Sequence, residues 1–447
     1  MSQNTPSFDL IQTEPRVLFR RYFLHSLLST VMTAAFVLCD TIFIGRGVGS
    51  DGLAALNIAL PCYTLMTAFA QMLGAGGATA ISYSKGQGKD HEANGLFTTA
   101  ILLAAVVSLS LGALGCIFWK PIAYACGADD SIITLTGQYL TILNGSAVVF
   151  VFNNMLGFFV RNDHAPRWAM IASVTGCLLN ILLDYLFIFP LGFGMAGAIS
   201  ATVLSSGTSA LLLARHFFTK KATLRLDFAG VSLGGLRRIL MGGLPNCIAE
   251  LSTGVVILLF NLRLMQLGGV DAVTSYSIIS NTAYVFLAVF GGVNNTIQPL
   301  ISFNARAGYY RRVLQFLRYG YGVVFALCAT LVAIGELFPQ IIVQVFIANP
   351  SDAILSCAVP AIRFYFAAYL LMCFNMVSAT FLQSVEQARA ASVLSFCRGF
   401  LFLVPFLYLL SGLLGINGVW LTVPASELLT FAGAVLLVGR MVRLYRE

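Results

Sequence analysis

Apolar residues fill long segments of this chain, and charged residues gather in the short stretches between them. We recognise twelve segments long enough to cross a bilayer as helices of about 20 residues. The alternating pattern of a membrane β-barrel is absent. The pattern therefore predicts an all-α integral membrane protein with twelve transmembrane helices, at 20–45, 53–83, 96–118, 132–160, 167–190, 194–217, 237–265, 273–303, 314–337, 355–383, 391–411 and 416–440.

Composition supports this class, because 58% of the residues are hydrophobic and only 10% are charged, against about 25% in soluble proteins. The net charge of +8 could indicate a nucleic-acid-binding protein, but Lys and Arg residues in the cytoplasmic loops of a membrane protein explain this charge better. With the N-terminus inside, all 26 Lys and Arg fall on the cytoplasmic face except Arg46, Lys120, Arg263 and Arg363. We therefore expect a multi-pass protein of the cytoplasmic membrane with both termini inside, the lipid bilayer as its surroundings and no nucleic-acid partner.

The chain also repeats itself at a spacing of 220 or 221 residues. The repeated positions are Asp51 and Asp271, Ser82 and Ser302, Asn154 and Asn375, and Gly197 and Gly418. This spacing predicts an N-terminal six-helix lobe (1–218), a cytoplasmic linker (219–236) and a C-terminal six-helix lobe (237–447). Two such lobes facing a central cavity are typical of alternating-access transporters. A duplicated channel or scaffold is the alternative.

Four oxygen-bearing side chains fall in the outer half of the N-terminal lobe: Asp40, Asn180, Asp184 and Thr202. An Asp at mid-span costs roughly 3 kcal/mol, and less nearer the edge, so such residues are usually functional. Asn180 and Asp184 share one helix face. Two carboxylates there either share a proton or hold a cation, and these oxygens suit H⁺ as well as Na⁺. Alternatively, the two Asp residues are unrelated and lie at the interface.

The C-terminal lobe lacks a matching pair of Asp residues but carries Glu250 and Glu427 inside predicted spans. Either could attract a cationic substrate or assist proton movement, or could be a hydrogen-bonded structural residue. Aromatic side chains that could line a substrate cavity, or simply pack, are Phe36, Tyr63, Tyr139, Phe150, Phe152, Tyr276 and Tyr284.

Several motifs resemble those of the multidrug and toxic compound extrusion (MATE) family. They are Asp40–Gly45, Gly77–Gly88, Asn180–Asp184, Gly194–Ala198 and Gly243–Pro245. The resemblance implies a V-shaped pair of six-helix bundles and antiport of drugs against H⁺ or Na⁺. It also implies a cation site at Asp40, Asn180, Asp184 and Thr202, with the carbonyl of Ala198. Some members place a Glu later in the seventh span, whereas Glu250 follows Pro245 by only five residues.

We therefore predict a monomeric exporter of lipophilic, mostly cationic organic compounds that needs no cofactor beyond its coupling ion, H⁺ or Na⁺. A lipid-linked saccharide flippase is the alternative, but the charges within the spans are mainly acidic and do not suit a pyrophosphate. A passive channel is a further alternative. An enzyme is not expected, because the four His residues lie in loops or at the inner face and form no catalytic or metal-binding spacing.

Overall fold

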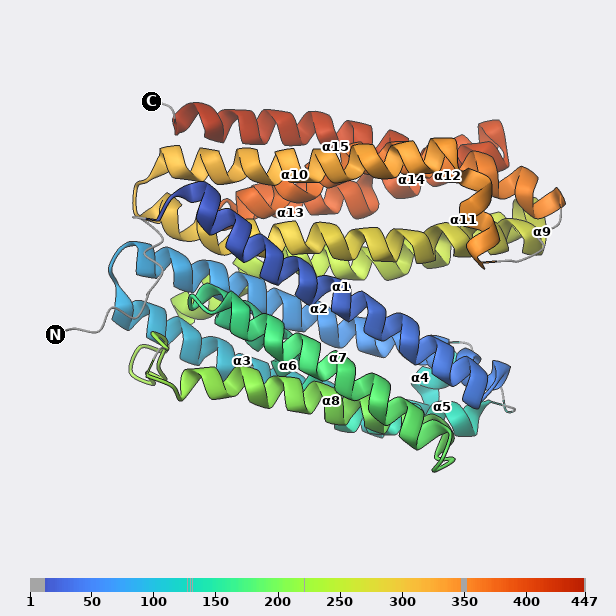
Figure 1. Cartoon of the computed structure of the whole chain (residues 1–447), viewed down its shortest axis with the longest axis horizontal. Helices are drawn as coiled ribbons and strands as arrows, with labels where there is room; N and C mark the ends of the chain where they lie inside the picture. The colour runs from blue at the N-terminus through green and yellow to red at the C-terminus, as the bar shows by residue number, and fades with distance from the viewer. Residues whose placement is uncertain are drawn as a thin grey trace.

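The computed structural model describes residues 13–126, 128, 130, 132–220, 222–346 and 352–445. Within these residues every element of regular secondary structure is a helix (Figure 1), which confirms the predicted all-α fold class. The helices are α1 (Pro15–Gly47), α2 (Ser50–Gly86), α3 (Asp90–Ile117), α4 (Trp119–Ala125), α5 (Ile133–Gly145), α6 (Ala147–Asn162), α7 (Pro166–Ile188), α8 (Gly194–Phe217), α9 (Leu233–Arg306), α10 (Tyr310–Leu337), α11 (Pro339–Phe346), α12 (Asp352–Ser384), α13 (Ala388–Phe396), the π-helix η1 (Cys397–Leu401), α14 (Leu403–Leu414) and α15 (Ile416–Leu444).

Ten helices of the described chain are long and apolar enough to cross a membrane, and the bent pair α5 and α6 makes eleven spans. The pair is the predicted span 132–160, broken by a 54° bend. Predicted spans seven and eight both fall within α9, which consists of two helices that meet at Gly269, where the backbone leaves the helical conformation with a φ of 62°. The predicted span 391–411 consists of α13, η1 and α14.

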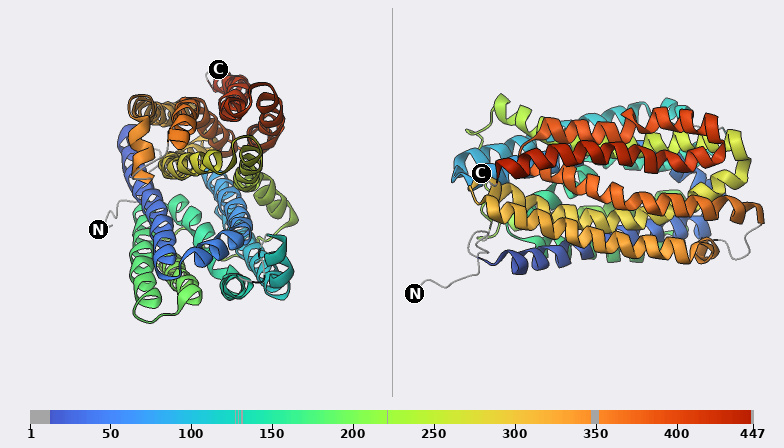
Figure 2. Two further views of the ribbon diagram at one scale, coloured as in Figure 1. Left: turned by 90° about the vertical axis from the view of Figure 1, so that its right-hand side faces the viewer. Right: turned by 90° about the horizontal axis from the view of Figure 1, so that it is seen from above.

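The buried apolar side chains form two main clusters. One is built from Ile44 to Ile239. The other is built mainly from Phe260 to Val438 but also takes in Leu18, Phe19 and Tyr22 of α1. Helix α1 therefore packs on both clusters, and Figure 1 shows it running obliquely across the molecule. We call α1–α8 the N-terminal half and α9–α15 the C-terminal half; Figure 2 shows them end-on as two groups.

The two halves approach most closely where α2 crosses α9. A Cβ atom on Gly243 would lie 1.8 Å from the Met72 carbonyl oxygen, and one on Gly76 would lie 2.1 Å from that of Ile239. Only glycine permits such backbone contact. Away from this crossing and from the end that carries Pro15 and Leu444, the helices of the two halves diverge in Figure 1. This divergence gives the molecule the V shape expected of the fold.

A buried cluster of charged residues holds the segment between the halves against the N-terminal half. Asp163 forms an ion pair with Lys85 at 2.9 Å, contacts His216 Nε2 at 2.8 Å and accepts a hydrogen bond from the Thr223 backbone N–H at 3.0 Å. Burial alone would raise the pKa of Asp163, but the His216 hydrogen bond and the Lys85 charge outweigh it and hold the pKa well below its usual range.

Candidate functional site

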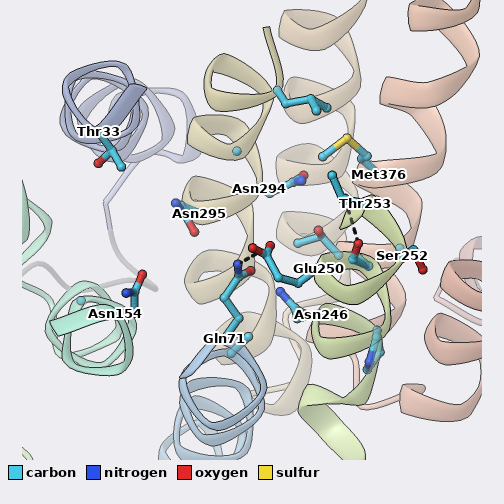
Figure 3. Close-up of a pocket in the computed structure, with 18 of the residues that line it drawn as sticks. Thr33, Gln71, Asn154, Asn246, Glu250, Ser252, Thr253, Asn294, Asn295 and Met376 are labelled. Carbon is cyan, nitrogen blue, oxygen red and sulfur yellow. Dashed lines mark hydrogen bonds between the residues drawn. The ribbon is translucent and has the colours of Figure 1, made fainter. Parts of the chain in front are cut away.

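A cavity of about 670 Å³ lies between the halves. It is lined by residues of α1, α2, α6, α7, α8, α9, α12, α13, η1, α14 and α15. Its wall is rich in side-chain amides: Gln71, Asn153, Asn154, Asn246, Asn294, Asn295, Gln298 and Gln383. Figure 3 shows Asn154 and Thr33 across the cavity from Glu250 and Asn294. Amides can donate and accept hydrogen bonds, so this wall can bind varied polar groups within an apolar surround.

Glu250 lies on the cavity wall and links the two halves. Its carboxylate accepts hydrogen bonds from Thr67 Oγ1 at 3.1 Å and from Gln71 Nε2 at 2.7 Å, both on α2. Figure 3 shows Gln71 and Glu250 pointing toward each other. Both donors are neutral, and the ion pairs found in the described chain do not include Glu250. Its carboxyl group therefore lines the cavity without a basic partner among the described residues.

Glu427 also lines the cavity, but its charge is neutralised. Its carboxylate forms an ion pair with Arg398 Nε at 2.6 Å and accepts a hydrogen bond from Asn375 Nδ2 at 2.7 Å. These contacts support the structural interpretation of Glu427. The π-helix η1 places Arg398 inside the protein, where charge counting along the sequence had put it at the cytoplasmic face.

Arg161 was also assigned to the cytoplasmic face, and the structure instead places it on the cavity wall. Its guanidinium carbon lies 4.9 Å from the Phe158 ring centroid, and its Nη1 lies 3.5 Å from the position of a Cβ on Gly157. The side chain thus folds back along α6, as helical side chains commonly do. The expectation that the charges within the spans are mainly acidic is therefore wrong for the cavity, which two Arg and two Glu residues line.

The candidate aromatic residues divide between cavity and core. Phe36, Tyr63 and Tyr276 line the cavity. Tyr139 and Phe150 are instead buried in the N-terminal core, and Phe152 packs against it, because their rings fill space between helices. The Tyr284 side chain lies outside the described residues. Two Tyr residues that the sequence did not single out, Tyr365 and Tyr369, also line the cavity.

The four oxygen-bearing residues of the N-terminal half meet where α1, α7 and α8 pack together. Asn180 and Asp184 are completely buried, and Asp40 and Thr202 nearly so. The Asn180 amide donates to Thr202 Oγ1 at 3.4 Å, and Thr202 Oγ1 donates to the Ala198 carbonyl at 3.1 Å. The carboxyl groups of Asp40 and Asp184 interact electrostatically. The grouping expected from the sequence is thus present in space.

Several oxygens of this group are buried without a hydrogen-bond donor among the described residues: Oδ1 of Asp40, Oδ1 of Asn180, and both carboxyl oxygens of Asp184. Buried polar atoms normally have partners, and each unpaired one is costly. A proton or a hard cation such as Na⁺ would satisfy these oxygens. No cluster of three or more His, Cys, Asp or Glu side chains in the described chain could hold a metal ion, so such a site would rely on the neutral oxygens too.

The acidic group is separate from the large cavity yet adjoins it. The cavity is lined by Phe36 of α1, Cys177 of α7 and Ser205 of α8, but not by Asp40 or Thr202. On each helix the lining residue and the member of the acidic group are three or four positions apart, or about 5 Å along the helix axis. The cavity therefore lies nearer than the acidic group to the end of the molecule that carries Pro15. An ion and an organic substrate could therefore occupy neighbouring sites on the same three helices.

Comparison with known proteins identifies the family. The MatE family matches residues 24–186 and again 245–409, so the two matches begin 221 residues apart, the spacing of the repeated motifs. The chain therefore belongs to the MatE family and is a MATE family efflux transporter.

Its relatives include two named multidrug export protein MepA. That of Staphylococcus haemolyticus (strain JCSC1435) is 25% identical over 410 residues, covering 91% of this chain and 89% of the relative. That of Staphylococcus aureus (strain NCTC 8325) is 25% identical over 421 residues, covering 92% and 91%. Among solved structures, "Crystal structure of MATE in complex with MaL6" matches with a TM-score of 0.91 at 22% identity, covering all of both chains. "Outward-facing conformation of a multidrug resistance MATE family transporter of the MOP superfamily" gives 0.89 at 23% identity, again over both whole chains.

Proposed function

We propose that this protein is a multidrug antiporter that exports lipophilic organic compounds in exchange for H⁺ or Na⁺. The observation that carries the proposal is the set of buried, unpaired oxygens at Asp40, Asn180 and Asp184, next to the cavity between the halves. The names of the MepA relatives support multidrug export. The cavity wall combines aromatic rings, Met side chains and amides, a lining that suits chemically different organic compounds.

Exchange would follow from competition between two conformations. Contacts between the halves include the α2–α9 crossing, the packing of α1 on α9, and an ion pair between Arg238 Nη1 of α9 and Glu92 of α3 at 2.6 Å. We assign the end that carries this ion pair to the cytoplasm, from the distribution of Lys and Arg, so the present conformation is the outward-facing one. Ion binding at Asp40 and Asp184 would favour substrate release and return to the inward-facing state.

On the same distribution of Lys and Arg we propose that the protein lies in the cytoplasmic membrane with both termini inside. We further propose that one chain suffices for transport, because the cavity and the acidic group are both built within it.

A lipid-linked saccharide flippase is the second candidate, and Arg161 is the observation in its favour. A pyrophosphate would need several cations, however, and Arg398 is already paired with Glu427. Arg161 alone is too little positive charge for a pyrophosphate, so the flippase is the weaker of the two candidates.

Ethidium efflux from energised cells that express the protein tests the proposal, with and without Na⁺ and with a protonophore. We expect energy-dependent efflux; its loss with the protonophore would indicate H⁺, and its dependence on Na⁺ would indicate Na⁺. Efflux that depends on neither the H⁺ gradient nor the Na⁺ gradient would contradict antiport. Absence of efflux for ethidium and for other dyes would favour the flippase.

A further inference from the structure

A smaller cavity, of about 380 Å³, lies between α2, α9 and the start of α13, at the end of the molecule that we assign to the cytoplasm. Its wall carries three arginines, Arg237 and Arg238 of α9 and Arg389 of α13, and one acidic residue, Glu386. None of these four residues lines the large cavity between the halves or belongs to the acidic group of the N-terminal half. The smaller cavity is therefore a separate site.

The acidic residue of this cavity belongs to a balanced network of charges. Arg238 Nε donates to Glu386 at 2.7 Å, and Arg238 Nη1 forms an ion pair with Glu92 at 2.6 Å. Lys89 Nζ lies 3.8 Å from the same Glu92 carboxylate. Two basic and two acidic side chains thus neutralise one another, and this network leaves no net charge at the cavity.

The other two arginines keep their positive charge. Arg237 and Arg389 are exposed and belong to none of the ion pairs formed within the described residues. Arg389 lies in the first turn of α13, a helix of nine residues whose N-terminus has no side-chain cap. The N–H groups of a first turn have no acceptor within their helix and carry partial positive charge. Two guanidinium groups and an open helix N-terminus on one cavity make an arrangement that suits a phosphate group.

These groups lie at the depth of lipid head groups. The two membrane-crossing segments concerned, Leu233–Gly269 and Ala388–Leu414, have 37 and 27 residues. As helices they are about 55 Å and about 40 Å long, more than the roughly 30 Å of the hydrocarbon layer, so their first turns reach the head-group layer. The cytoplasmic leaflet carries anionic lipids, and basic pockets between membrane helices on that side bind their head groups.

From this arrangement we infer that the smaller cavity binds the phosphate group of an anionic phospholipid of the cytoplasmic leaflet. The guanidinium groups of Arg237 and Arg389 pair with the phosphate oxygens, and the first N–H groups of α13 add hydrogen bonds. A zwitterionic lipid binds less well, because its own cationic group competes with the arginines for the phosphate. This lipid is neither the exported compound nor the coupling ion, so the inference goes beyond the proposed function.

Phosphatidylglycerol and phosphatidylcholine with the same dioleoyl chains provide a matched test, because the first head group is anionic and the second is zwitterionic. Binding of each lipid to the purified full-length protein in detergent is measured by native mass spectrometry. We expect the first phosphatidylglycerol to bind about tenfold more tightly than the first phosphatidylcholine, the effect of two arginines near one anionic head group. Arg237→Gln combined with Arg389→Gln should remove this preference.

A control pair of substitutions separates this site from the general attraction of anionic lipids to a basic surface. Arg311 and Arg318 are exposed residues of α10 that do not line the smaller cavity. Arg311→Gln combined with Arg318→Gln removes the same amount of charge and should leave the lipid preference unchanged. Equal binding of the two lipids to the wild type would overturn the inference. So would a preference that persists without Arg237 and Arg389, or one that both pairs of substitutions reduce equally.

Inorganic phosphate tests the other source of the same chemical group. In the same detergent, thermal unfolding of the wild type and of the Arg237→Gln, Arg389→Gln variant is compared in phosphate and in chloride buffers of equal ionic strength. We expect phosphate to affect both proteins alike, because the site takes a phosphate that the membrane holds at this depth. A melting temperature that phosphate raises in the wild type alone would assign the site to soluble phosphate and overturn the lipid as its ligand. Neither measurement uses an ion gradient, so the inference can fail while antiport holds, and antiport can fail while the inference holds.

Discussion

Replacing Gly243 by Ala should shift the protein away from the conformation described here. Gly243 lies where α9 crosses α2, and a Cβ atom there would be 1.8 Å from the Met72 carbonyl oxygen and 2.5 Å from its carbon. Both neighbours are backbone atoms, so no change of side-chain rotamer can relieve the overlap. The two helices must separate, or the halves must rearrange.

The size of the effect follows from this geometry. Ordinary contact begins at 3.4 Å, so the helices must separate by about 1.5 Å to restore contact at the usual carbon–oxygen distance. Overpacking of this kind typically costs about 1–3 kcal/mol. A cost of about 2 kcal/mol changes the ratio of two conformations about 30-fold. A conformation with the α2–α9 crossing open that lies within about 2 kcal/mol of the present one would then become the major one.

Double electron–electron resonance measures this shift. Spin labels on Cys introduced at Lys89 and Arg311, both exposed and in opposite halves, report the separation at the cytoplasmic end. The ten native Cys residues are first replaced. Gly254→Ala is the matched control on the same helix, because a Cβ atom there has no neighbour within 4 Å. We expect a longer distance to dominate in Gly243→Ala and the wild-type distribution to persist in Gly254→Ala.

An unchanged distance distribution and an unchanged melting temperature in Gly243→Ala would refute the reasoning. That result would mean that α2 and α9 can absorb the methyl group without separating.

Three further predictions follow from the charged groups. Glu427→Gln leaves Arg398 unpaired, and because the pair is mostly buried we expect thermal unfolding to show a loss of roughly 2 kcal/mol of stability. Adding Arg398→Met to this variant should restore the stability and so confirm the cause, whereas an unchanged melting temperature in Glu427→Gln would contradict it. Burial lowers the pKa of His164 to about 4, so folding favours the neutral imidazole, and below the unfolded pKa of about 6.5 stability should fall by up to about 1.4 kcal/mol per pH unit. His164→Asn, a residue that suits the φ of 61°, should flatten this pH dependence of stability. A pH dependence that stays steep in the variant would exclude His164 as its source. Arg238→Gln breaks the partly exposed ion pair between Arg238 and Glu92, which joins the two halves. We expect a change of about 1 kcal/mol or less in the conformational equilibrium, larger at low salt in the same resonance assay. A salt-independent change would contradict the ion-pair explanation.

The sequence predicted the helical architecture and the grouping of the acidic residues for clear physical reasons. The length of an apolar run determines whether it can cross a bilayer, and a carboxylate inside such a run stands out because it is costly. Asp40, Asp184 and Thr202 therefore could be related by depth alone, and the structure brings them together.

The charge of the cavity could not be predicted in the same way. Arg161 and Arg398 come near the ends of apolar runs, where counting assigns them to the cytoplasmic face. The Arg161 side chain reaches the cavity because it folds back over Gly157, and Arg398 reaches it because of the π-helix at Cys397–Leu401. A hydropathy pattern contains no information on either feature. Composition likewise could not separate Tyr63, on the cavity wall, from Phe150, which meets it edge-on with centroids 5.7 Å apart in the core.

Ion flux coupled to substrate transport tests the central claim, that Asp40 and Asp184 couple an ion to export. The purified protein is reconstituted in proteoliposomes, and ethidium movement is recorded together with internal pH and with radioactive Na⁺. We predict that ethidium transport by the wild type is accompanied by counterflow of one of these ions. The Asp40→Asn and Asp184→Asn variants should lose that ion flux but should still bind ethidium. Ion-coupled ethidium transport at the wild-type rate in both variants would contradict the account.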